Sequence, residues 1–222
     1  MILAIVTGLA ATMILIELLA RARPWPSVAT WWRRAALLNG FQLAVAWIAG
    51  RTWDRWLGEF RPWSIDHFSV EVQTVLGYVA ITFVYYWWHR ARHRVPLLWR
   101  WVHQVHHSPA RIEVITSFYK HPLEILLNSW LSVAILYFLV GVGPEAAAWA
   151  VLVTGVAELF YHWNVGTPHH ERGLHAFNYT DLPLWDVLFG TFRNPRAWMA
   201  SCGFGEEREQ RLGAMLRGRE VA

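Results

Sequence analysis

Histidine is the residue type that most equips this chain for chemistry, because eleven histidines are present and ten of them lie between positions 89 and 175. Five of the ten form two ordered sets, His89 and His93, followed by His103, His106 and His107. The first pair has the spacing i, i+4 and the second set the spacing i, i+3, i+4, so a helix would present each set on one face. Neutral imidazole is a common protein ligand for iron, zinc and copper. The ordered spacing therefore predicts a metal site.

Pro96 lies between the two sets and is expected to break the helix that carries the first one. The second segment could then fold back against the first. In that arrangement all five imidazoles would converge on one volume.

A second concentration of histidines, carboxylates and amides follows along the chain. It contains His121, Glu124, Glu158, His162, Asn164, His169, His170, His175, Asn178, Asp181 and Asp186. Eight or more imidazoles exceed the needs of one four-coordinate ion, so the sequence predicts two metal ions. Glu158 precedes His162 by one helical turn and is expected to accept a hydrogen bond from a ligand imidazole. Glu124, Asp181 and Asp186 are expected to lie just outside the ligands, with an ordinary cap or surface role as the alternative for each.

Five apolar runs are available to position these residues. They are Met1–Ala20, Ala35–Gly50, Val70–Trp88, Leu123–Val142 and Ala146–Tyr161. A transmembrane helix needs roughly 20 mostly apolar residues, with a working range of about 17–25, so several of these runs are near the lower limit. The runs predict an all-α, multi-pass membrane bundle of four to five spans with a cytosolic, His-rich helical cap.

The composition supports a membrane protein. Hydrophobic residues make up 55% of the chain and charged residues 16%, and sixteen tryptophans are present. The apolar content excludes a disordered chain, and the single cysteine excludes a disulfide framework. A net charge of +4 raises the question of nucleic acid, but the charges fall at the ends of the apolar runs. They therefore indicate a membrane and no nucleic-acid partner.

The basic residues also predict how the chain is oriented. If all five runs cross the membrane, seventeen of the twenty Lys and Arg residues lie on one side, together with ten histidines. Basic residues mark the cytosolic side. We therefore expect an integral protein of a bacterial inner membrane, with its N-terminus outside and its histidines and C-terminal tail in the cytosol. The polar stretch from Glu206 to Gly218 is expected to form an exposed helix or frayed tail.

The order of these motifs resembles the fatty acid hydroxylase / sterol desaturase superfamily of integral-membrane, non-haem diiron oxygenases. The resemblance covers roughly residues 70–195 and rests on the segments His89–His93, His103–Pro109, His121–Glu124, His162–Asn164, Asn178–Tyr179 and Leu184–Phe192. It implies a catalytic domain over 70–195, preceded by N-terminal membrane helices and a loop over 1–69 and followed by a polar tail over 196–222.

The resemblance further implies two iron ions that activate O2 to hydroxylate or desaturate a lipid C–H bond. It assigns the metal ligands to His89, His93, His103, His106, His107, His162, His169 and His170, with His121 and His175 also in motif positions. It places Glu124, Glu158, Asn164, Asn178 and Asp186 around those ligands. The chain carries no evident flavin or iron–sulfur motif, so a ferredoxin, a cytochrome b5-like protein or a reductase must supply two electrons per turnover. The basic cytosolic face would suit an acidic partner of that kind.

The last histidine box departs from the family pattern. Gly166 stands where the leading histidine of an HxxHH element is expected, and the path from Asn164 to Pro168 is short. A catalytically impaired metal-binding relative therefore remains an alternative. A membrane haem protein and a metal transporter are less favoured, because the histidines cluster at the ends of the apolar runs and the outer half of the bundle offers few polar groups.

Overall fold

The computed structural model describes residues 2–165, 178–193 and 202–221. Within these ranges the chain is helical and forms no β-strand, only an isolated bridge between Arg21 and Val165. The all-α prediction is therefore confirmed.

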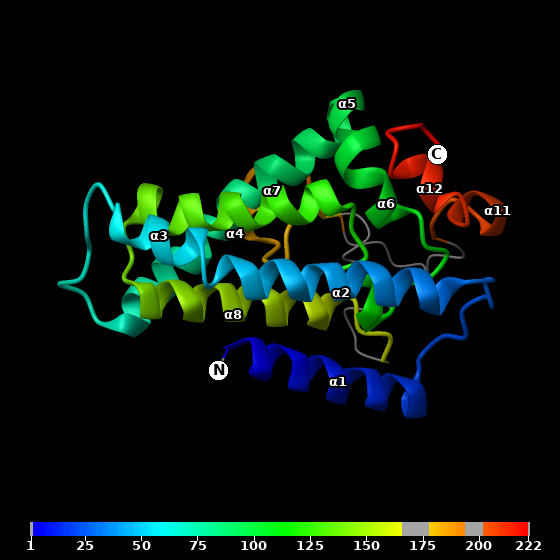
Figure 1. Cartoon of the computed structure of the whole chain (residues 1–222), viewed down its shortest axis with the longest axis horizontal. Coiled ribbons are helices and arrows are strands. Elements are labelled where there is room, and N and C mark those ends of the chain that lie inside the picture. The colour runs from blue at the N-terminus through cyan, green and yellow to red at the C-terminus, as the bar shows by residue number, and fades with distance from the viewer. Residues whose placement is uncertain (1, 166–177, 194–201, 222) are drawn as a thin grey trace.

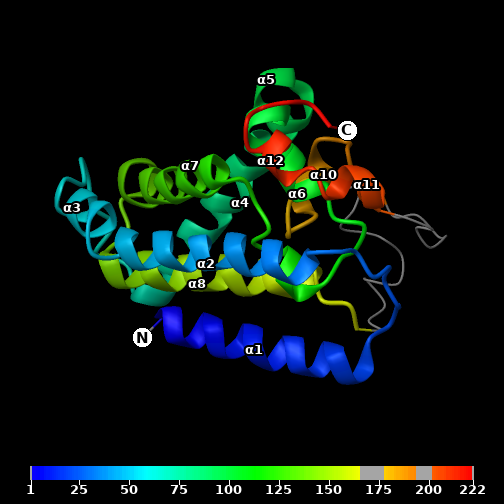
Figure 2. The same ribbon diagram turned by 45° about the vertical axis from the view of Figure 1, so that its right-hand side comes forward.

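Five long helices correspond to the five predicted apolar runs. They are α1 (Ile2–Ala20), α2 (Trp31–Ala49), α4 (Val70–Arg94), α7 (Pro122–Val133) with its π-helical continuation η3 (Ala134–Val140), and α8 (Pro144–Tyr161). Figure 1 shows them running side by side along the long axis of the molecule, and Figure 2 shows the same arrangement from a second direction. α4 packs against α8 and η3, α2 packs against α7, and α1 packs against α8.

The helix boundaries follow from local sequence. The Ser69 hydroxyl accepts a hydrogen bond from Val72 N at the start of α4, and prolines occupy the first turns of α7 and α8. Proline is tolerated there because the first helical N–H groups have no intrahelical partner. Gly141 ends η3 with φ +80°, a conformation that glycine adopts without steric cost.

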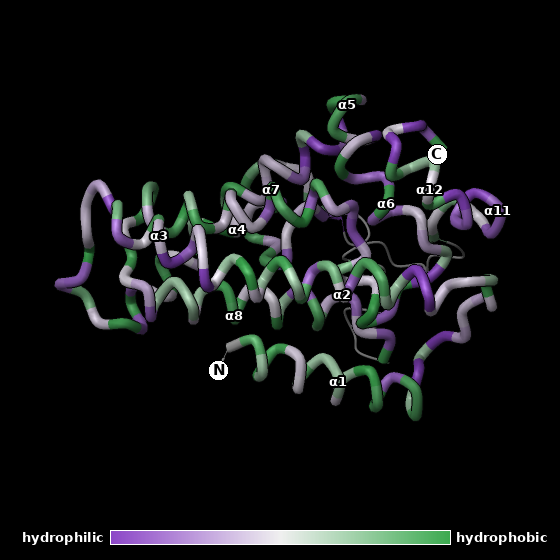
Figure 3. The backbone as a smooth tube through the Cα atoms, in the orientation of Figure 1, coloured by the Kyte–Doolittle hydropathy of each residue, from purple (hydrophilic) through white to green (hydrophobic). Residues whose placement is uncertain are grey.

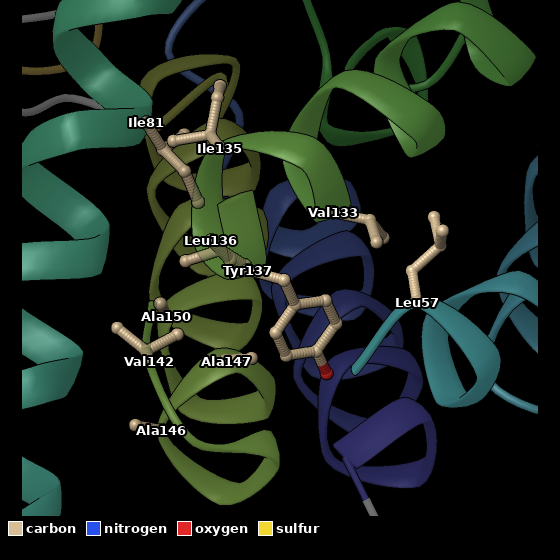
Figure 4. Packing of buried hydrophobic residues seen from close by; sticks show 10 residues of the cluster. All are labelled: Leu57, Ile81, Val133, Ile135, Leu136, Tyr137, Val142, Ala146, Ala147 and Ala150. Carbon is tan, nitrogen blue, oxygen red and sulfur yellow. The ribbon is translucent and has the colours of Figure 1, made fainter. Parts of the chain in front are cut away.

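Gly77 permits the central helices to approach each other closely. A Cβ atom at this position would lie 2.8 Å from Leu136 Cδ2 and 3.3 Å from Ala150 Cβ. The surrounding core lies between α3 (Trp53–Glu59), η3 and α8, with Ile81 contributed by α4. Figure 4 shows its side chains, among them Tyr137, converging from these elements.

Two helices in the described part of the chain are candidate membrane spans by length and composition. Leu3–Ala20 and Pro122–Val140 are long and apolar enough to cross a membrane. Figure 3 shows continuous apolar stretches along α1 and α8 and a more polar backbone at the end where α11 (Glu206–Glu209) and α12 (Leu212–Met215) lie. The count of four to five spans stays a prediction.

Short elements gather at that same end of the bundle. α4 ends at Arg94 and α5 (Pro96–Leu98) begins at Pro96, so the predicted break is confirmed. It is followed by η1 (Trp99–His103), α6 (Gln104–His107) and η2 (Val114–Thr116), while α10 (Leu184–Leu188) lies against α4.

The segment from Glu206 to Gly218 was expected to be an exposed helix or frayed tail; it forms two short helices and much of it is exposed, but it is docked on the fold through buried side chains. Leu212, Met215 and Val221 are buried in a second core that includes Trp31 and Val105. Glu209 is fully buried, and its Oε1 lies 2.7 Å from Nη2 of Arg34 in α2. A few buried apolar side chains and one buried ion pair therefore hold this charged segment against the rest of the fold.

Candidate metal centre

Four histidines converge where α4 meets the folded-back segment η1–α6. His89 and His93 lie one turn apart on α4, and His103 and His107 come from η1 and α6. One ligating nitrogen from each of the four lies within 4.8 Å of the others. The Nε2 atoms of His89 and His93 are 3.0 Å apart, and so are those of His103 and His107. We call this set the four-histidine group.

Two of these rings are held by hydrogen bonds at the nitrogen that faces away from the group. His89 Nδ1 donates to the carbonyl oxygen of Tyr179 at 2.8 Å. His103 Nδ1 donates to Glu124 Oε1 at 3.0 Å, and Glu124 also pairs with Arg92. Because Nδ1 carries the proton in both rings, Nε2 keeps a lone pair that can bind a metal ion.

The support for His89 comes from the last motif of the domain. Asp186 is fully buried, and its carboxylate accepts from Tyr179 N at 3.1 Å and from Thr191 Oγ1 at 2.8 Å. Asn178 closes the same loop by exchanging two hydrogen bonds with the backbone of Arg193. Asp186 therefore acts on the metal site through the Tyr179 backbone.

A second set of potential metal ligands lies beside the four-histidine group. His106, Glu158 and His162 each bring one ligating atom within 4.8 Å of the others, and we call them the His–Glu group. The His106 ring lies 5.5 Å from that of His107 and 5.4 Å from that of His162, measured between centroids. His162 Nδ1 donates to the Glu158 carbonyl oxygen at 2.8 Å, which fixes the orientation of the ring. The expected hydrogen bond from a ligand imidazole to the Glu158 carboxylate stays a prediction, and among the described residues Glu158 Oε1 lies 2.6 Å from Lys120 Nζ.

The division of His103, His106 and His107 between two groups differs from the prediction of one shared face. η1 is wound as a π-helix up to His103, and α6 begins at the next residue. His106 and His107 are adjacent in sequence and therefore lie about 100° apart around the helix axis, which places them in different groups.

Burial keeps the imidazoles of the folded-back segment neutral. It lowers the pKa of His107 to about 3, with the charges of His93 and Arg92 as smaller contributions. Burial also lowers the pKa of His103 and of His106 well below the ordinary value of 6.5. Neutral imidazole is the form that binds metal ions, so these rings are ready to act as ligands at neutral pH.

The chemistry of these side chains suits the binding of metal ions. His106 Nδ1 is buried and has no hydrogen-bond partner among the residues that the structure describes. An unpaired buried nitrogen is costly unless a ligand satisfies it. Imidazole nitrogens with one carboxylate are ligands that suit iron or zinc.

A cavity of about 250 Å³ opens onto both groups. Its wall runs from the histidines into the bundle, where Ile81, Thr82, Asn128 and Thr154 contribute side chains from α4, α7 and α8. Cys202 and Gly203 of the C-terminal segment line the same cavity. A small part of a larger molecule could therefore approach the metal-binding atoms.

Some residues proposed from the sequence belong to neither group, although Asp181 lines the same cavity. His121 belongs to neither group: its Nδ1 accepts from Leu123 N as the cap of α7, and its Nε2 donates to the Leu216 carbonyl oxygen at 3.4 Å. Asp181 accepts from the Tyr78 hydroxyl at 2.8 Å, and Asn164 bonds to the backbone of Arg23. His169, His170 and His175 lie outside the described residues.

Sequence reasoning missed three residues of this site. Arg92 stands three positions after His89 and could have been found from that spacing; it pairs with Glu124. Lys120 could have been suspected only as a basic residue next to a motif histidine. Tyr179 acts through its carbonyl oxygen, and a backbone group leaves no signal in the side-chain sequence.

Comparison with known proteins places these residues in one family. The family model described as fatty acid hydroxylase matches residues 74–191, more than half of the chain. The chain is 33% identical over 180 residues to an ornithine lipid hydroxylase of Rhizobium tropici, covering 72% of this chain and 53% of that protein. It is 33% identical to a very-long-chain aldehyde decarbonylase of Oryza sativa subsp. indica, covering 60% and 58%. It is 28% identical to the alkylglycerol monooxygenase of Homo sapiens, covering 52% and 29%.

The chain thus spans about half the length of the first two relatives and less than a third of the other. No solved structure matches it.

Proposed function

Because the chain belongs to the fatty acid hydroxylase family, we propose that it is a membrane-bound, metal-dependent oxygenase that hydroxylates or desaturates a C–H bond of a lipid. This proposal rests on seven residues with metal-ligating atoms, which form two adjacent groups at one end of the bundle. Two adjacent ions are what these two groups would hold, and the apolar helices beside them would meet lipid.

In this proposal His89, His93, His103 and His107 hold one iron ion, and His106, His162 and Glu158 hold the other. His169 and His170 stay proposed as further ligands, since the second group has fewer donors in the described part of the chain. Iron bound here would supply the activation of O2 that cleavage of an unactivated C–H bond requires. We do not assign His121 to an ion, because both of its ring nitrogens are engaged elsewhere.

Residues next to the metal ligands would orient those ligands, and the cavity would position the substrate. Glu124 and the Tyr179 carbonyl fix the tautomers of His103 and His89. The cavity would admit the reacting carbon from the bilayer, with the remainder of the lipid left among the apolar helices. Hydroxylation places one atom of O2 in the product and the other in water, so two electrons and two protons must come from outside.

The need for two external electrons indicates a redox partner protein. A ferredoxin, a cytochrome b5-like protein or a reductase would deliver the electrons at the histidine-bearing end, which the distribution of basic residues assigns to the cytosol. The three relatives named above act, by their names, on an ornithine lipid, a very-long-chain aldehyde and an alkylglycerol. We propose a lipid with a polar headgroup as the substrate class, because the two groups come from the last turns of α4 and α8 and from the short elements η1 and α6.

The proposal is tested by metal analysis joined to lipid profiling. Purified full-length chain should contain close to two irons, and cells that express it should accumulate a lipid that has gained one oxygen atom or lost two hydrogen atoms. His106→Ala should abolish the lipid change with the fold retained. His67→Ala is the matched control, because His67 is exposed and contacts Phe68 away from both groups.

Two results would contradict this function. A single zinc ion or no metal in the purified protein would favour the second candidate, a metal-binding relative without oxygenase activity. That candidate draws its support from Gly166 in place of a histidine in the last box. Equal losses in His67→Ala and His106→Ala would show that the loss is not specific to the His–Glu group, and the test would then contradict the proposed role of that group.

A further inference from the structure

Glu17 is the one ionisable residue of α1, and no part of the proposed chemistry uses it. Its side chain is buried, with 7% of the residue exposed, although much of α1 faces outward. An ionisable side chain in an apolar helix is costly to place, so it indicates a function and a partner. α1 lies outside the region that the fatty acid hydroxylase family model matches.

The Glu17 carboxylate joins two segments that are distant in sequence. Its Oε2 atom accepts a hydrogen bond from Val114 N at 3.0 Å and a second one from Asn164 N at 2.9 Å. Val114 opens η2, and Asn164 follows the end of α8. A single oxygen atom therefore holds both segments against α1.

The first of these segments forms one wall of the His–Glu group. Three residues after Val114, the Ser117 hydroxyl donates to the Glu158 carbonyl oxygen at 3.3 Å. Farther along, Lys120 Nζ lies 2.6 Å from Glu158 Oε1. Both contacts with Glu158 thus come from the segment that begins at the Glu17 hydrogen bond.

The second segment carries His162 itself, two residues before Asn164. The Asn164 side chain is fixed in turn, because its Oδ1 accepts from Arg23 N at 3.2 Å and its Nδ2 donates to the Arg23 carbonyl oxygen at 2.8 Å. Ala22 N also donates to the Asn164 carbonyl oxygen at 3.0 Å. The end of α1 and the residues after it therefore clamp the chain next to His162.

We propose that Glu17 is a positioning residue for the His–Glu group and that α1 sets the geometry in which this group binds its metal ion. The inference rests on the proposed function, since it assumes that the group binds a metal. It makes α1 part of the metal centre, in addition to any role that the helix has in the membrane. The four-histidine group receives no contact from Glu17 and should be independent of it.

The contacts require an acceptor oxygen, and they do not require its charge. Both hydrogen bonds end on Oε2, so the carbonyl oxygen of glutamine can replace it, whereas leucine offers no acceptor. Glu17→Gln should therefore retain binding of the second ion, and Glu17→Leu should weaken it. Residues that support metal ligands typically contribute about 10- to 100-fold in metal affinity.

The experiment is a Co²⁺ titration of the full-length, metal-free chain in detergent, with iron content measured in parallel. Wild type, Glu17→Gln and the control Thr12→Val, an exposed position on the same helix, should each bind two ions. Glu17→Leu should bind the first ion normally and the second about 10- to 100-fold more weakly. Asn164→Ala removes the two side-chain hydrogen bonds to Arg23 and should weaken binding of the second ion in the same way. If Glu17→Leu does not fold, Asn164→Ala tests the inference in its place.

Amide hydrogen exchange of the metal-free chain separates this inference from the proposed function. Exchange at Val114 and Asn164 should accelerate in Glu17→Leu and stay unchanged in Glu17→Gln. Normal binding of the second ion by both Glu17→Leu and Asn164→Ala would overturn the inference and leave the oxygenase proposal standing. Loss of both ions in a folded Asn164→Ala variant would also overturn it, because the effect would not be selective. A wild-type chain that binds no Co²⁺ would instead refute the proposed function.

Discussion

Glu124 should be the most consequential residue that does not itself bind a metal ion. It is fully buried and accepts a hydrogen bond from His103 Nδ1 at 3.0 Å while it pairs with Arg92, which is 5% exposed. Glu124→Ala removes both contacts. Arg92 would then be a buried cation without its partner, and the His103 ring would lose the acceptor that fixes its tautomer.

Glu124→Ala should lower both the free energy of unfolding and the affinity for a metal ion. Breaking a buried ion pair by removing one partner costs about 3–5 kcal/mol of folding free energy. Losing the acceptor of a ligand imidazole costs about 10- to 100-fold in metal affinity, or roughly 1.4–2.7 kcal/mol of binding free energy. The affected ion is the one held by the four-histidine group, because His103 belongs to it.

The two losses can be separated with a second variant. Replacing both Arg92 and Glu124 by methionine leaves no unpaired charge, so the free energy of unfolding should return toward that of wild type. Metal affinity should stay low, since His103 still lacks its acceptor. Unfolding by denaturant and Co²⁺ titration measure the two quantities. Wild-type affinity in Glu124→Ala would refute the argument that this carboxylate orients His103.

Two further predictions concern the C-terminal segment. Burial raises the pKa of Cys202 to about 11, so alkylation in the folded chain at pH 8 should be about 200-fold slower than in the unfolded chain, where a thiol pKa is about 8.5. The rate should rise about tenfold per pH unit up to pH 10, because the thiolate reacts; equal rates in the folded and unfolded chain would contradict the burial of this thiol. Glu209→Ala should lower the free energy of unfolding by about 3–5 kcal/mol because it leaves Arg34 buried and unpaired. The exposed Glu207→Ala should change it by less than about 0.5 kcal/mol, and similar effects of the two substitutions would mean that the segment is not docked.

The helices were predictable because apolar runs and helix-breaking residues are local signals. Pro96 marks a predicted boundary that the structure confirms, and prolines also occupy the first turns of α7 and α8. The ends of the helices were less predictable. α4 continues to Arg94, six residues past the apolar run, because polar residues at a helix end prolong the helix as well as apolar ones do.

The pairing of histidines was predictable only where the helix is regular. His89 and His93 share a face as the i, i+4 spacing predicts. His106 separates from His103 and His107 because the i+3 and i+4 positions of a helix lie about 100° apart around its axis, and the spacing alone does not tell which neighbouring element each position faces. The contacts of Glu17 and Glu209 join residues far apart along the chain, so linear spacing could not reveal them.

The region that carries the family resemblance is not a self-sufficient unit. Glu17 accepts the N–H groups of Val114 and Asn164, and Glu209 accepts that of Ala110 at 2.9 Å. A chain limited to residues 70–195 would leave these three enclosed donors without their acceptors, at about 1–3 kcal/mol each. Val114 and Ala110 both lie in the segment that follows the second set of histidines. The N-terminal helix and the C-terminal segment therefore help to hold the segments that carry or follow the histidines.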